Sequence, residues 1–472
     1  MVAFDQVSKE HAYNEGEGDR SLTYWQKIIK IFLKRNMPNK TRLFQQIVPA
    51  YVKRLKSFLF DQLKKMKVKK KMKNKIKETN LLFIASGLIG IIVGTIDTIF
   101  GRGLLWLSTF RQAHFLLLII FLAPVGVVFT YFFLKYGKNS VQGMGLIFQV
   151  GHNEADTIPK RIVPFTILGT WLTHLFGGSA GREGVAVQVG ATVSHWFRRF
   201  FPKQEASRFI VIGMAAGFSG LFETPIAATF FAMEVLVTGR LRYDVLLPTF
   251  LAAFTAFFTS KILGLEKFSV PLNVSLELTP SFWFKLLLFG VLFGWTGRLF
   301  ARLLRKGKQF VEKIIPDPLK RIGMIGLFVS LLLLLFFKGR YSGLGTNLIS
   351  SSFAGEPIYW YDWFLKLVLT VLTISAGFLG GEVTPLFAIG SSLGVLLGTW
   401  FNFPIPLAAA LGYASVFASA TNTLIGPALI GAEVFGLTYF PVFLLVCGLA
   451  FSCNGNESIY GKQKIVDNQL TR

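Results

Sequence analysis

Long apolar stretches, separated by short polar segments, fill the chain from about residue 80 onward. The stretches that could form membrane helices are 80–101, 115–135, 163–177, 209–237, 245–264, 283–304, 323–337, 363–378, 386–400, 405–417 and 424–452. Some approach the roughly 20 residues needed to cross a bilayer, whereas others are shorter and interrupted by Gly or Pro. Interrupted segments are typical of helices that stop inside the membrane and line a cavity. The pattern predicts an all-α polytopic membrane protein and favours a transporter or channel.

The first 78 residues have a different pattern. Apolar residues recur at helical spacing among lysines in 22–34 and 52–63, and a dense basic run follows at 64–77. Such segments are typical of amphipathic helices at a membrane surface. Because basic residues beside a first span stay in the cytoplasm, we expect this region to be cytoplasmic and to touch anionic lipid.

Composition narrows the classes of protein. Hydrophobic residues make up 52% of the chain and charged residues 16%, which argues against a soluble enzyme, a disordered scaffold and a disulfide-rich secreted domain. The net charge of +25 would suggest a nucleic-acid partner in a soluble protein. However, residues 1–80 hold 20 Lys and Arg against seven Asp and Glu, about half of the net charge. No nucleic-acid motif accompanies them, so we predict a topology anchor without a nucleic-acid partner.

The remaining candidate chemistry is sparse. The five His residues, Cys447 and Cys453 show no metal-ligand spacing, and no hydrolase, acyltransferase or aspartyl-protease pattern is present. We therefore expect no metal, no cofactor and no enzymatic activity.

An internal repeat relates two glycine-rich breaks. When 177–190 is placed beside 377–390, Gly177, Gly181 and Gly190 coincide with glycines 200 residues later, and each break follows an apolar stretch. This predicts two related halves, about 79–265 and 266–462, with a substrate site where the repeats meet.

A carboxylate lies in each break, Glu183 in the first and Glu382 in the second. Free N–H groups and partial positive charge at the start of a helix make an anion site. A carboxylate there can take the place of the anion and leave it on protonation, so Glu183 is a candidate gate and proton carrier. The alternative is a structural Arg182–Glu183 ion pair, which is disfavoured because adjacent residues on a helix do not face each other.

Four motifs in order resemble the CLC family of anion channels and transporters. GREGVAVQVGA at 181–191 resembles its GREGP signature, GMGLIF at 143–148 its GSGIP, and GGEVTP at 380–385 its GGIFAP, while Tyr460 in SIYGK matches its ion-coordinating tyrosine. The likeness runs from about residue 80 to 462. It implies the CLC fold with two inverted repeats, and an anion site at the positions of those motifs. The implied anion-site residues are Met144, Gly145, Phe148, Arg182, Gly184, Val185, Val383, Thr384 and Tyr460.

Departures from the signatures indicate one branch of that family. Met144 stands where the chloride-binding serine would be, and Val185 replaces the proline of GREGP. Together with the acid Glu382 in GGEVTP, these changes resemble the fluoride/proton antiporters. Glu382 is then a second acidic site, for protons or ions.

The inner proton glutamate of chloride exchangers is missing. FFAMEVL at 230–236 resembles the family's FIIEEM, with Glu234 at its first acid and Val235 at the proton glutamate. Because Val cannot carry a proton, the resemblance leaves that role to Glu183.

The resemblance implies a homodimer in the plasma membrane of a bacterium that exports fluoride in exchange for protons. Both termini would be cytoplasmic, with 463–472 a short tail. The alternatives are a CLC chloride channel or chloride/proton exchanger, an intramembrane enzyme, and an interaction protein with a membrane anchor.

Overall fold

The computed structural model describes residues 42–201, 205–266, 268–276 and 278–466. The chain divides into two compact units, Met1–Glu78 and Thr79–Arg472. The expected segment 22–34 lies outside the described residues. Segments 52–63 and 64–77 are both helical, and they belong to α3 (Arg42–Ala113), which continues into the second unit.

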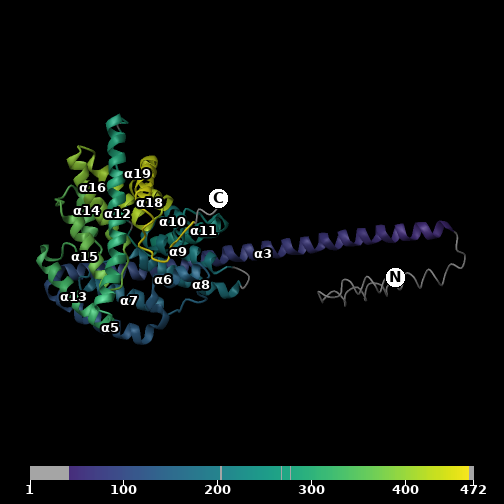
Figure 1. Cartoon of the computed structure of the whole chain (residues 1–472), viewed down its shortest axis with the longest axis horizontal. Coiled ribbons are helices and arrows are strands. Elements are labelled where there is room, and N and C mark those ends of the chain that lie inside the picture. The colour runs from purple at the N-terminus through teal and green to yellow at the C-terminus, as the bar shows by residue number, and fades with distance from the viewer. Residues whose placement is uncertain (1–41, 202–204, 267, 277, 467–472) are drawn as a thin grey trace. The chain divides into compact units, whose positions relative to one another are not determined.

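Helices build almost all of the second unit (Figure 1). After α3, the first half contains α4 (Phe115–Leu118), η1 (Ile119–Phe121), α5 (Leu122–Gly137), η2 (Lys138–Gln142), α6 (Met144–Gly151), α7 (Ile162–Leu175), α8 (Glu183–Phe197), η3 (Arg198–Phe200), α9 (Ala206–Phe222), α10 (Pro225–Val235), η4 (Tyr243–Val245) and α11 (Leu246–Ile262). The second half contains α12 (Pro280–Ile314), α13 (Pro318–Leu335), η5 (Phe337–Gly339), α14 (Thr346–Ala354), α15 (Asp362–Ala376), α16 (Val383–Trp400), α17 (Ile405–Thr421), α18 (Ile425–Phe435), η6 (Leu437–Tyr439) and α19 (Phe440–Ser452).

The two halves repeat the same order of helices. Helices α7 and α15 begin 200 residues apart, as do α8 and α16, and α10 and α18. Helix α8 packs along α9, and α16 packs along α17 in the same way. The fold is therefore all-α and built of two related halves with discontinuous helices, as the sequence predicted.

Two predicted single spans are each two helices. The stretch 209–237 breaks at Glu223, which has the left-handed φ of +59°, and α10 restarts at Pro225. Proline has no N–H to continue the preceding helix. The stretch 424–452 breaks at Gly436, where φ is +131°. The short helices α6, α8 and α14 lie outside the predicted spans because Gly-rich turns bound them.

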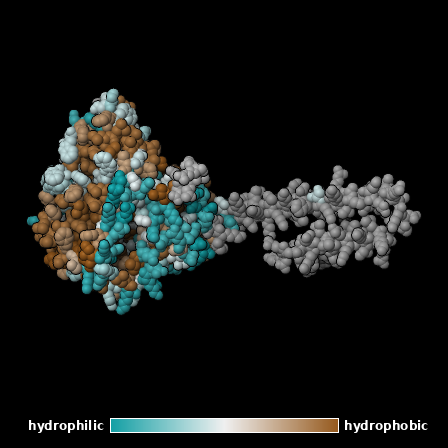
Figure 2. Space-filling model, viewed as in Figure 1, coloured by the Kyte–Doolittle hydropathy of each residue, from teal (hydrophilic) through white to brown (hydrophobic). Residues whose placement is uncertain are grey.

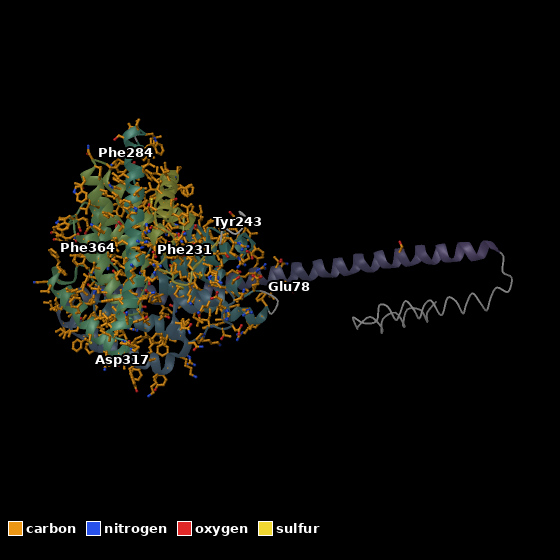
Figure 3. The ribbon with its side chains drawn as sticks, in the orientation of Figure 1. Glu78, Phe231, Tyr243, Phe284, Asp317 and Phe364 are labelled. Carbon is orange, nitrogen blue, oxygen red and sulfur yellow. The ribbon has the colours of Figure 1, made fainter. Side chains whose placement is uncertain are left out.

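The second unit exposes an apolar surface suited to lipid. Figure 2 shows broad hydrophobic areas on the visible face, and large side chains such as Trp106, Ile262 and Leu335 are exposed. Six helices of the described chain are long and apolar enough to cross a membrane. Figure 3 shows Phe231, which is fully buried, inside the unit, and Phe284, which is exposed, near the start of α12.

The C-terminal segment is fastened to the helices. Strand β2 (Lys464–Ile465) pairs in parallel with β1 (Val237–Thr238), which follows α10. Residues 463–466, which the sequence assigned to a tail, are therefore part of the folded unit.

Candidate functional site

Two glycine turns meet where the repeats join. Gly181 N donates to Gly381 O at 2.5 Å, and Gly381 N donates to Gly181 O at 2.8 Å. A Cβ on Gly181 would lie 2.8 Å from Pro385 Cδ, and one on Gly381 would lie 2.9 Å from Gly184 N. Only glycine permits this approach, and it brings the starts of α8 and α16 together.

The Glu183 carboxylate contacts the start of α16, a helix of the other half. Glu183 is the first residue of α8 and is fully buried. Its Oε2 accepts hydrogen bonds from the backbone N–H of Thr384 at 3.1 Å and from the Thr384 hydroxyl. Thr384 lies in the first turn of α16, where an anion would find free N–H groups. The carboxylate therefore accepts from donors of the kind that bind anions at helix starts.

Arg182 also contacts this carboxylate. Its Nε lies 3.5 Å from Glu183 Oε1, and its backbone N–H donates to Glu183 Oε2 at 3.4 Å. The ion pair that the sequence disfavoured is present, because Arg182 precedes the helix and has a φ of −128°. Within the described residues, Arg182 Nε, Arg182 Nη1 and Glu183 Oε1 are buried without a hydrogen-bond partner, which leaves polar capacity for an ion or water.

Glu382 lies beside the start of α8. It is the half-buried N-cap residue of α16, and its Oε2 would lie 3.6 Å from a Cβ on Gly184. The two glutamates thus lie near each other's helices, but with different partners. Val185, the third residue of α8, is buried. Gly184 stands in α8 where Thr384 stands in α16, and glycine has no hydroxyl for Glu382.

The remaining predicted residues lie at the start of α6, in the first turn of α16 and in the C-terminal segment. Met144 begins α6 and is half-buried, as is Gly145, while Phe148 is fully buried. The Phe148 ring stacks on the Tyr460 ring with centroids 5.3 Å apart. Tyr460 is itself buried. Val383, in the first turn of α16, is fully buried.

Val235, the last residue of α10, is fully buried. Its side chain cannot carry a proton. Its carbonyl accepts from Gln463 Nε2 at 2.9 Å. Glu234 caps α18 by accepting from the N–H groups of Leu424 and Ile425 at 2.6 and 3.0 Å. Its carboxylate therefore has a structural role.

Sequence reasoning missed two polar residues near these helix starts. Tyr413 of α17 is buried against Phe387, with ring centroids 4.0 Å apart. Gln188 Nε2 would lie 3.6 Å from a Cβ on Gly143, and it has no partner among the described residues. A tyrosine and a glutamine inside apolar helices were the signals available.

Comparisons with known proteins show which family the chain resembles. A family model described as voltage gated chloride channel matches residues 125–455, and an ASCH domain model matches residues 1–49. A chloride/fluoride channel protein of Pseudomonas syringae pv. tomato is 32% identical over 392 residues, which is 80% of this chain and 85% of that protein. The ClcB chloride channel of Salmonella typhimurium is 28% identical over 60% of this chain and 70% of its own length.

Solved structures show the same fold. The crystal structure of a CLC-type fluoride/proton antiporter is 58% identical, with a TM-score of 0.81, and the match covers 82% of this chain and 98% of that one. A slow cyanobacterial Cl−/H+ antiporter shares the fold at 19% identity, with a TM-score of 0.69 over 80% of this chain and 96% of its own. Because the family model matches more than half of the chain, the chain belongs to the voltage gated chloride channel family, known as the CLC family.

Proposed function

We propose that this protein is a fluoride/proton antiporter that exports fluoride from the cytoplasm. The observation that carries the proposal is the Glu183 carboxylate, which accepts from the amide and hydroxyl of Thr384 at the start of α16. The relatives support the choice of ion, since one is described as a chloride/fluoride channel and another as a fluoride/proton antiporter.

Glu183 couples the two ions by competing with fluoride. While ionised, its Oε2 occupies the donors of Thr384 and the Arg182 N–H. Protonation removes the charge that those donors stabilise, so the side chain leaves and a fluoride ion takes the same donors. When fluoride departs and Glu183 returns, the proton is released. One site thus binds either the anion or the carboxylate.

Fluoride suits these donors because it is small and tightly hydrated, so strong N–H and O–H donors must replace its water. The starts of α8 and α16, the Arg182 side chain, and the Tyr460 hydroxyl and Phe148 ring edge supply such groups. Met144 brings no hydroxyl to the start of α6. Glu382 is a second acid for the ion or proton, beside Gly184.

The biological setting follows from the same reading. We place the protein in the plasma membrane of a bacterium, as a homodimer with one pathway in each subunit. The basic region 1–78 lies on anionic lipid, with both termini in the cytoplasm.

The test is ion flux in liposomes that hold the purified full-length protein. An inward proton gradient should drive fluoride out against its gradient, with little chloride flux. In Glu183→Gln, fluoride movement should no longer respond to the proton gradient. Equal or greater chloride flux in the wild type would instead favour the chloride channel or exchanger, and unchanged coupling in the variant would remove Glu183 from this role.

A further inference from the structure

A lysine is buried inside the second half with no acid among its partners. Lys366 lies one turn into α15, and its exposed fraction is 0%. A charged side chain inside a membrane protein is costly and is a functional candidate by default. The site described above does not use it.

The Lys366 ammonium donates to three neutral oxygens. Nζ lies 2.9 Å from Ser179 Oγ, 3.1 Å from Tyr341 O and 2.7 Å from Gly343 O. An ammonium has three N–H donors, so all three are used. The positive charge is solvated by dipoles and is not cancelled by a carboxylate.

These bonds join the turn that leads to Glu183 to a turn of the other half. Ser179 and Gly343 form an isolated parallel bridge, in which Ala180 N donates to Gly343 O at 3.3 Å and Gly343 N donates to Gly178 O at 3.0 Å. Ser179 precedes Glu183 by four residues. Lys366 therefore lies directly behind the turn that carries the proposed gate.

The surroundings add positive charge. Arg111 lies at the same turn: it is 4% exposed, donates to His174 O at 2.8 Å, and its guanidinium would clash with a Cβ on Gly343. The nearest acid along α15 is Asp362, which is held by Arg340 at 2.7 Å. Among the described residues, no acid forms an ion pair with either of these two buried cations, and charge acts strongly in a medium of low dielectric.

The repeat lacks this charge in its other half. The position equivalent to Lys366 is Thr166, whose hydroxyl bonds Ile162 O in its own helix. The turn equivalent to 178–180 contains Phe378 and Leu379, which are apolar. A cation therefore occupies this position of the repeat in one half only.

We propose that the fixed charge of Lys366 is a determinant of anion affinity on the Glu183 side of the pathway. It raises the electrostatic potential at the turn before Glu183, so that fluoride, or the Glu183 carboxylate that stands in for it, is favoured there. This inference rests on the proposed fluoride/proton exchange.

Two variants separate the charge from the hydrogen bonds. Lys366→Met removes both, whereas Lys366→Gln removes the charge and keeps an amide that can donate to the same oxygens. Lys285→Met is the matched control, since Lys285 also donates to a backbone carbonyl, that of Asn402 at 3.2 Å, but on another surface. Folding is checked by size-exclusion profile and thermal unfolding in detergent.

Fluoride flux is measured against fluoride concentration in liposomes of each full-length variant. Both Lys366 variants should raise the half-saturating fluoride concentration about tenfold or more, with a smaller effect on maximal rate, because a unit charge has been lost from a buried site. Lys285→Met should behave as wild type. A folded Lys366→Gln variant with the wild-type half-saturating fluoride concentration would overturn the inference. Lys366 would then only hold the two turns together. Absence of proton-driven fluoride flux in the wild type would instead overturn the proposed function.

Discussion

Glu234 and Glu433 cap each other's helices across the repeat. Glu234 of α10 accepts from the first N–H groups of α18, and Glu433 of α18 accepts from Ile226 N at 3.2 Å and Ala227 N at 2.7 Å, at the start of α10. Both carboxylates satisfy helix ends that would otherwise attract an anion. Two helix N-termini are thus capped by acids that stay in place. The start of α16 is instead capped by Glu183, which we propose can move.

These caps should support stability without carrying protons. Glu234→Gln should lower the free energy of unfolding by about 1–3 kcal/mol, because charge-assisted bonds to buried amides are weakened. Glu433→Gln should cost less, since Glu433 is only half-buried. Thermal unfolding in detergent measures the loss, and the fluoride to proton ratio in liposomes should not change. An altered ratio would show that these acids take part in exchange.

The Thr384 hydroxyl should matter for the ion that replaces Glu183. Thr384→Val keeps the shape and removes the donor, so the half-saturating fluoride concentration should rise about tenfold, within the range of hydrogen bonds to charged groups. Thr399→Val is the control, because the Thr399 hydroxyl bonds Val395 O in the same helix, on an exposed face. Equal half-saturation in the two variants would count against a fluoride site at Thr384.

Met144 should limit chloride transport. Met144→Ser adds a hydroxyl at the start of α6, and we expect chloride flux to rise relative to fluoride flux. The readout is the ratio of the two fluxes from ion-selective electrodes. If the ratio stays at the wild-type value, the role of Met144 is packing against the apolar core.

Glu457 should make the stability of the protein sensitive to acid. Burial raises the pKa of Glu457, but hydrogen bonds from Arg302 and Arg305 outweigh it and hold the pKa below its usual range. With a folded-state pKa below the unfolded one, the stabilisation is present at neutral pH and is lost as pH falls below about 4. Glu457→Gln should therefore lower the melting temperature at pH 7 more than at pH 3.

The control for that experiment is Glu312→Gln, because Glu312 is exposed and lies 3.8 Å from Arg321. It should change the melting temperature little at either pH. A Glu457 variant with the same deficit at both values of pH would mean that the carboxylate charge does not hold this segment.

The sequence predicted the architecture because its signals are local. The glycine breaks 200 residues apart predicted the helix starts of α8 and α16, with an acid in each break. Helix ends inside long apolar stretches were missed, although Pro225 marked one of them. The contact of Glu183 with Thr384, the mutual caps of Glu234 and Glu433, and the bonds of Lys366 could not be predicted. Each joins residues of different segments, and the pairing depends on how the two halves pack.

The paired glycines 181 and 381 limit the kind of movement that transport can use. Rocking one half against the other would break both backbone hydrogen bonds at once, at a depth where little water could replace them. Rotation of a carboxylate about its own side-chain bonds breaks neither. The halves can therefore remain rigid throughout the transport cycle. The moving part would be the side chain of Glu183, and its departure or return would determine which ion crosses next.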